Sequence, residues 1–110
     1  MIIDFSDIAR KSLPAFKGGE KSYDVKMVDD DLGNKFMDGI LTPGASIGMH
    51  THEGNCEAIY ILEGCGTVLE ADGAHPVKAG MCLFCPDGKN HSLCNTGETD
   101  LHFFATVIKQ

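Results

Sequence analysis

The chain has 110 residues and a mass of 11.8 kDa, which is the usual size of one domain. Hydrophobic residues make up 43% of it and charged residues 23%, a balance typical of soluble globular proteins rather than of disordered ones. The net charge of −7 and the pI of about 5.0 argue against two kinds of partner, because nucleic acids and anionic membranes both attract basic surfaces. We therefore expect no nucleic-acid partner and no membrane partner.

The five cysteines have irregular spacing and an odd count, which is not the pattern of a disulfide framework. No basic and apolar leader opens the chain, and no apolar run approaches the ~20 residues of a membrane-spanning helix. Free thiols are typical of a reducing compartment, so we expect a cytoplasmic protein. Cys82 and Cys85 are three residues apart on an expected strand, which predicts that they point to opposite faces and share neither a metal nor a disulfide.

Residues 1–20 are expected to form an N-terminal arm that is mostly irregular or contains a short helix. Ser6 and Asp7 can cap a helical turn that continues to Lys11 and that Pro14 would end. The residues of 17–20 indicate a turn. Residues 21–110 are expected to form the single domain.

Eight short segments after residue 20 are strand candidates, because apolar residues alternate or cluster between glycine-rich turns. They cover residues 23–28, 36–41, 47–51, 58–62, 66–71, 81–85, 91–95 and 101–108. Asp72-Gly73 is typical of a two-residue hairpin turn. No helical period follows the arm, so we predict an all-β sandwich or barrel.

The tripeptide His50-Thr51-His52 is the most informative part of the sequence. Residues i and i+2 of a strand lie on one face, so the two imidazoles can bind one divalent ion. Glu57 follows a turn-prone segment that can return its carboxylate to the same place, and His91 lies farther along the chain. Three nitrogens and one oxygen suit Mn, Fe, Ni, Zn, Co or Cu, and affinity alone does not select among these metals.

The glycines and prolines around these residues resemble the two motifs of the cupin family. The first motif places a glycine before His-x-His, then a glutamate and a second glycine. The second motif consists of a glycine, Pro-x-Gly, a histidine and an asparagine. Every fixed position is present at the family's intervals: Gly44, His50, His52, Glu57, Gly64, Gly80, Pro86, Gly88, His91 and Asn95. Ten fixed positions are far more specific than a lone glycine pattern, and they span about half of the chain.

The resemblance implies a cupin-type jelly-roll β-barrel that holds one divalent transition metal on His50, His52, Glu57 and His91. It also implies a homodimer, because small cupins commonly pair by sheet packing or by exchange of a strand, with the N-terminal arm as the exchanged piece. The family includes isomerases, dioxygenases, decarboxylases, lyases and non-enzymatic ligand-binding domains. Fold therefore does not decide the function.

The single arginine, Arg10, lies in the arm, away from both motifs. Sites that hold phosphates or carboxylates usually use arginine, so we expect a neutral or weakly charged organic ligand, with Lys89 as the nearest lysine in sequence. The metal and apolar walls would then hold that ligand. Seven residues near the motifs are candidates for these walls, with their side uncertain: Met49, Ile59, Ile61, Phe84, His102, Phe103 and Phe104.

Two functions from different classes are compatible with these residues. The first is a metal-dependent enzyme that acts on a small organic molecule, either an isomerase or lyase or a dioxygenase. Its catalytic residues are not identified by the sequence. The second is a non-catalytic cupin that binds a metal or a small molecule, as a sensor or binding protein does.

Overall fold

The computed structural model describes residues 1–110 and contains ten β-strands and two single-turn 3-10 helices. The helices are η1 (Phe5–Asp7) and η2 (Phe16–Gly18). The strands are β1 (Lys11–Pro14), β2 (Ser22–Asp29), β3 (Lys35–Leu41), β4 (His50–Thr51), β5 (Asn55–Glu63), β6 (Cys65–Glu70), β7 (Gly73–Lys78), β8 (Cys82–Cys85), β9 (Asn90–Cys94) and β10 (Leu101–Lys109). No helix of the structure is both long enough and apolar enough to cross a membrane.

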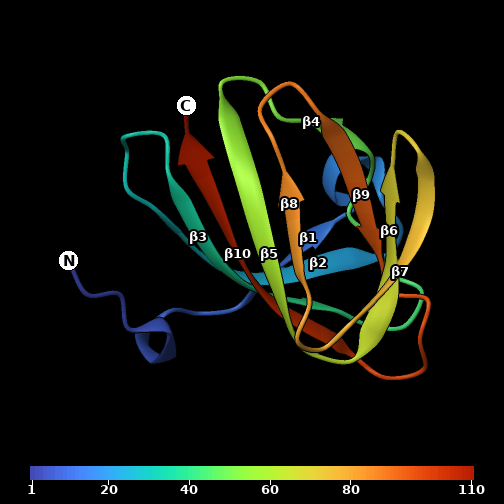
Figure 1. Cartoon of the computed structure of the whole chain (residues 1–110). Helices are drawn as coiled ribbons and strands as arrows, with labels where there is room; N and C mark the ends of the chain where they lie inside the picture. Colours follow the sequence, from blue (N-terminus) through green and yellow to red (C-terminus); the bar gives the residue numbers. More distant parts are fainter.

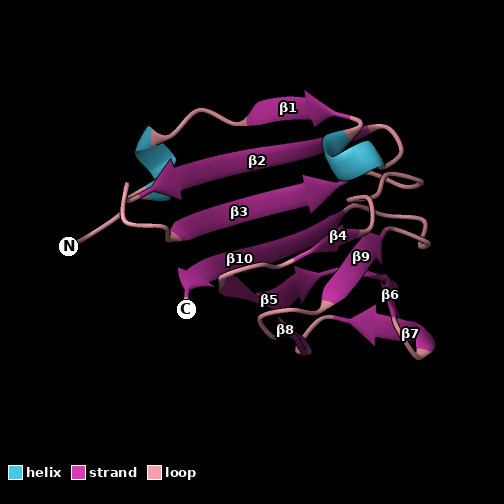
Figure 2. Ribbon diagram, turned by 90° about the horizontal axis from the view of Figure 1, so that it is seen from above, coloured by secondary structure: helices cyan, strands magenta, loops and turns pink.

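Two antiparallel sheets form the body of the molecule. Six strands make one sheet in the order β1-β2-β3-β10-β5-β8, and four make the other in the order β4-β9-β6-β7 (Figure 1). Seen from above, the smaller sheet lies beside the β10-β5-β8 part of the larger one, while β1 and β2 lie at its far edge (Figure 2). This arrangement confirms the all-β jelly-roll predicted from the sequence.

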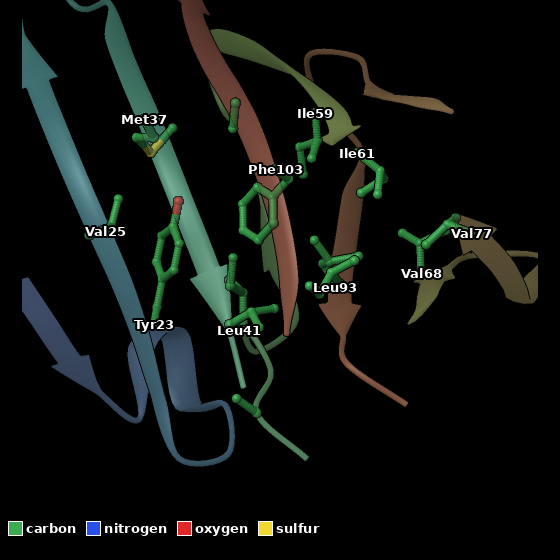
Figure 3. Packing of buried hydrophobic residues seen from close by; sticks show 14 residues of the cluster. Tyr23, Val25, Met37, Leu41, Ile59, Ile61, Val68, Val77, Leu93 and Phe103 are labelled. Atoms are coloured by element: carbon green, nitrogen blue, oxygen red, sulfur yellow. The ribbon is translucent and has the colours of Figure 1, made fainter. Parts of the chain in front are cut away.

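The core lies between the sheets and consists of the inward side chains of both (Figure 3). Tyr23 on β2 and Phe103 on β10 are almost completely buried, and their rings stack with centroids 5.8 Å apart. Gly39 on β3 makes this stacking possible, because a Cβ there would lie 2.6 Å from the Tyr23 ring and 2.7 Å from the Phe103 ring. Side chains therefore fill the interior of the barrel around Tyr23 and Phe103.

The arm is more ordered than the sequence predicts. The expected helical turn is limited to η1, and residues 11–14 form the edge strand β1, which pairs with β2. Pro14 is compatible with this strand because it stands at the strand's end on the sheet edge. In place of a simple turn, residues 16–18 form η2.

The eight strand candidates are present with shifted ends, and besides β1 one further strand was not predicted. The segment 47–51 keeps only β4, and the β6–β7 turn consists of Ala71 and Asp72, one residue earlier than predicted. The unpredicted strand is β7, whose residues are exposed except for Val77, so it lacks an apolar alternation. Cys82 is exposed and Cys85 is buried, as opposite faces of β8 require.

Candidate metal centre and cavity

Three strands bring the four predicted ligands to one end of the barrel. His50 on β4 lies opposite His91 on β9 in the register, and Glu57 is on β5. His52 directly follows β4, and the β4–β5 loop turns the chain back so that Glu57 faces it. Figure 1 shows this loop, the β8–β9 loop and the C-terminus at the same end of the molecule. His52, Glu57 and His91 are buried, and His50 is partly buried.

The donor atoms of these side chains converge. The Nε2 atoms of His52 and His91 are 3.1 Å apart, and they lie 3.1 Å and 2.9 Å from Oε1 of Glu57. His50 Nε2 is 3.9 Å from the same oxygen. All four donor atoms lie within 4.8 Å of one another. The predicted ligand set is therefore one cluster in space.

The backbone and one amide fix which nitrogen points inward in two of the rings, those of His50 and His52. His50 Nδ1 donates to the carbonyl oxygen of Gly48 at 2.7 Å, and His52 Nδ1 donates to Oδ1 of Asn55 at 2.6 Å. With the proton on Nδ1, the Nε2 lone pair of each ring faces the cluster. The sequence places Gly48 two residues before His50 and Asn55 three residues after His52, so each partner is local.

Charge in the cluster is unbalanced without a cation. Burial disfavours the ionised form of Glu57, but its contacts with His50, His52 and His91 outweigh burial and hold its pKa well below the usual range. The contact with Glu57 raises the pKa of His52, burial opposes this, and the nearby ammonium of Lys17 also lowers it. The Glu57 carboxylate therefore stays ionised although it is buried, and it favours a cation bound beside it.

These features fit a divalent metal ion. Two ligands at right angles around an ion, each ~2.1 Å from it, are about 3.0 Å apart, which agrees with the distances among His52, Glu57 and His91. Inward Nε2 lone pairs and an ionised carboxylate are the donors such an ion requires. His50, His52, Glu57 and His91 would hold it, and a six-coordinate ion would keep two positions for other ligands.

A cavity of about 550 Å³ opens beside His50, His52 and Glu57. Its polar lining outside the cluster consists of Lys17, Tyr23, Lys35, Thr51 and Asn55. The apolar lining comes from Leu13, Phe16, Met27, Met37, Ile47 and Val107. Glu57 is the only carboxylate in this lining.

None of the seven predicted wall residues lines this cavity. Ile59, Ile61 and Phe103 point into the barrel as expected, but they are completely buried and form the core below the cavity. Strand alternation shows that they face inward and does not show how deep they lie. They are therefore core residues and not lining residues of this cavity.

The other four candidates lie on outer surfaces. Met49 is 48% exposed, and Phe84 is 58% exposed and lines a separate hollow of about 490 Å³, whose lining includes His91. Phe104 packs edge-on against Phe5 of the arm, with ring centroids 5.7 Å apart. His102 shares Oδ1 of Asp38 with Arg10, and both contacts are 2.9 Å long.

Arg10 lies outside the cavity, as its place in the sequence predicts, because Asp38 and the Asp24 carbonyl engage its guanidinium. Lys89 lines the separate hollow instead of the cavity.

The arm contributes to the cavity, which the sequence did not predict. Leu13, Phe16 and Lys17 line the cavity, although they lie well before Gly44, where the first motif begins. The sequence carries one sign of this packing in the glycines Gly18, Gly19 and Gly48, because two backbones approach closely only where a residue has no side chain. A Cβ on Gly48 would overlap the Lys17 carbonyl oxygen, and one on Gly19 would lie 2.8 Å from the Gly48 nitrogen.

Comparisons with known proteins agree with this geometry. The cupin domain family matches residues 38–107. An oxalate-binding protein from Thermotoga maritima is 35% identical over 113 residues, covering 98% of this chain and 93% of that protein. A crystal structure from Thermotoga maritima, described as a predicted oxalate decarboxylase, superposes with a TM-score of 0.92 at 33% identity and full coverage of both chains. A sugar phosphate isomerase of the cupin superfamily from Silicibacter pomeroyi shares the fold, with a TM-score of 0.80 at 19% identity over 100% of this chain and 76% of that one. Family match, relatives and geometry lead to one conclusion: the chain belongs to the cupin family.

Proposed function

We propose that this protein binds a divalent transition metal at His50, His52, Glu57 and His91 and uses it to bind a small carboxylate. The observation that carries this proposal is the convergence of three Nε2 atoms and an ionised carboxylate beside an open cavity that His50, His52 and Glu57 line. A bound divalent ion supplies a Lewis acid that accepts carboxylate oxygens. The donor set is compatible with Mn, Fe, Ni, Zn, Co or Cu.

A carboxylate replaces the neutral or weakly charged ligand expected from the sequence. That expectation depended on the distance of Arg10 from the motifs, whereas Lys17 and Lys35 supply positive charge to the cavity. The Thermotoga maritima relative, which is an oxalate-binding protein, also supports a carboxylate. Both observations favour an anion over a neutral molecule.

The lining favours binding over acid–base catalysis. Apart from the ligands His50, His52 and Glu57, the titratable groups that line the cavity are two lysines and one tyrosine: Lys17, Lys35 and Tyr23. Burial raises the pKa of the Tyr23 phenol, and the charges of Glu57 and Asp38 raise it further, so the phenol keeps its proton. An isomerase or lyase requires a group that accepts a proton beside the ligand, and the Tyr23 phenol, which keeps its proton, does not serve as that base.

The experiment that tests this function is calorimetric titration of metal-loaded protein with oxalate, followed by assays for product formation and oxygen uptake. We expect metal-dependent binding without turnover, and no binding by a His91→Ala variant. His75→Ala is the matched control, because His75 is on the exposed strand β7. Absence of oxalate binding by the loaded wild-type protein would contradict the proposal, and turnover would establish the isomerase, lyase or dioxygenase alternative.

We also propose that a second copy of this chain covers the outer face of β5 and β8. Tyr60, Leu62 and Phe84 are large apolar side chains exposed there, and Ala58 and Cys82 complete a face without charge. An uncharged face lets two copies of net charge −7 associate with little repulsion. Sedimentation analysis should show a dimer that Phe84→Glu dissociates, and a monomeric wild-type protein would refute this.

The five cysteines are free, which supports the expectation of a reducing compartment such as the cytoplasm.

A further inference from the structure

Two lysines at the mouth of the metal cavity have no acidic partner. Lys17 and Lys35 line the cavity, and neither ammonium forms an ion pair or a hydrogen bond within the chain. Lys17 instead lies over the Phe16 ring, with Nζ 5.6 Å from its centroid. No lysine of this chain forms an ion pair, so these two differ from the others by their place: they are the lysines of the cavity lining, where a ligand would supply the negative charge.

The position of Lys17 is fixed by the backbone. Gly48 N donates to the Phe16 carbonyl oxygen at 3.0 Å, and Ser46 N donates to that of Glu20 at 3.0 Å, so η2 is attached to the segment before β4. Lys17 has a left-handed backbone with φ of 56°, which a non-glycine residue adopts only where its surroundings impose it. Gly48 thus joins η2 to the metal centre, because its N–H donates to the Phe16 carbonyl and its own carbonyl oxygen accepts a hydrogen bond from His50 Nδ1.

The position of Lys35 follows from strand register. Lys35 on β3 is opposite Val107 on β10, and Val107 is opposite Glu57 on β5. Residues in such a row have side chains on the same face of the sheet. Lys35 therefore stands two strands away from the metal ligand, with the apolar side chain of Val107 between them.

From this arrangement we infer that the ligand is a dicarboxylate, one carboxylate binding at the metal centre and the other meeting Lys17 and Lys35. This inference depends on the proposed function and names its ligand class. The apolar lining, including Val107, Met27 and Phe16, lies between the two charged regions and suits the carbon chain that joins two carboxylates. The cavity of about 550 Å³ has the size of a site for a small organic molecule, larger than one chelating group needs.

The charges support selection of a dianion. A divalent ion exceeds the single negative charge of Glu57, and the two lysines add to the excess, so the loaded cavity is strongly positive. A ligand in which a neutral group replaces one of the two carboxylates loses half of its negative charge, and with it part of its attraction to the cavity. A dicarboxylate should therefore bind more tightly than its monoamide of equal length, although both offer one carboxylate to the metal.

The test compares succinate with succinamate by calorimetric titration of metal-loaded protein. We expect wild-type protein to bind succinate more tightly than succinamate. In the Lys17→Met and Lys35→Met variants, the ratio of these two affinities should fall about tenfold, since the loss of a hydrogen bond to a charged group commonly has this effect. Lys17→Arg should retain most of the preference because the charge remains. Lys89→Met is the control, since Lys89 lines the separate hollow.

Metal content, measured by elemental analysis of each variant, separates this inference from the proposed function. If wild-type loaded protein binds no carboxylate at all, the proposed function fails. If it binds succinate and succinamate equally, or if both lysine variants keep the wild-type preference at full metal content, the function stands and the role of the lysines is refuted.

Discussion

Two clusters in this barrel place a carboxylate against histidine, and they balance its charge differently. Glu57 is buried and faces three imidazoles, with no permanently charged cation in contact with it. Asp38 is partly exposed and accepts hydrogen bonds from the Arg10 guanidinium and from His102 at 2.9 Å each. The guanidinium keeps its charge at every ordinary pH, so the Asp38 cluster is complete within the chain.

The difference shows how a metal centre is distinguished from a structural ion pair that contains the same residue types. In the Glu57 cluster, the Nε2 atoms of three imidazoles converge on one carboxylate, and together they form the donor set of a divalent cation. In the Asp38 cluster, Oδ1 of Asp38 already accepts hydrogen bonds from Arg10 and His102. Asp38 also attaches the arm to β3, since Arg10 bonds both its side chain and its carbonyl oxygen.

The largest effect that separates the clusters is expected from Glu57→Gln. Removal of the only charged ligand should lower metal affinity by more than about 100-fold, because the loss of an outer-shell partner alone costs about 10–100-fold. Competition with a chromophoric chelator measures this affinity. The matched variant is Asp38→Asn, which removes the charge from the other carboxylate and should leave metal affinity unchanged. Equal affinities of the Glu57→Gln variant and the wild-type protein would show that Glu57 is no ligand.

The metal cluster could be predicted from the sequence because its residues match both cupin motifs at every fixed position. His50 and His52 share a face by strand alternation, and the motif intervals place Glu57 and His91 beside them. The spacing of glycines that shapes the turns is itself part of the motif. Glu57 is on the larger sheet and His50 and His91 are on the smaller one, so only the resemblance to the motifs implied that the donors meet.

The cavity walls could not be predicted in the same way. Alternation gives the direction of Ile59, Ile61 and Phe103, but their depth depends on where the opposite sheet and the arm close the barrel. Leu13, Phe16 and Lys17 reach the cavity only through the pairing of β1 with β2 and the attachment of η2 near Gly48. The contact of η2 with Gly48 joins segments about thirty residues apart, and no local pattern encodes it.

A second expected effect concerns metal removal. A ligand present at about 100 times its dissociation constant stabilises the folded state by about 2.7 kcal/mol, which corresponds to a melting temperature roughly 10 °C higher for a chain of this size. Chelation should therefore lower the melting temperature of the wild-type protein by about this amount and recover on addition of metal. Differential scanning calorimetry tests this, and Asp38→Asn should show the same chelator-dependent shift. A wild-type melting temperature that is insensitive to chelator would contradict a metal bound at the Glu57 cluster.

The smallest expected effect concerns the Asp38 cluster and its dependence on pH. Burial opposes ionisation of Asp38, but the hydrogen bonds and charges of Arg10 and His102 lower its pKa below the ordinary value. A carboxyl whose folded pKa is lowered stabilises the protein above its unfolded pKa of about 3.9, and this stability is lost as the pH falls through the lower folded value. Asp38→Asn should therefore cost about 1 kcal/mol near neutral pH, since the side chains of Arg10 and Asp38 are 28% and 23% exposed and solvent screens the pair in part.

Denaturant unfolding of wild-type and Asp38→Asn protein, both without metal, isolates this contribution, because Glu57 is present in both and its own acid sensitivity cancels in the difference. The difference in unfolding free energy should be constant above about pH 5 and should shrink toward zero in more acidic solution. A difference that grows on acidification would require a raised pKa of Asp38 and would refute the ion pair. A difference that vanishes at all pH values would mean that Arg10 holds the arm through the Asp24 and Asp38 carbonyl oxygens alone, since both of these bonds survive the substitution.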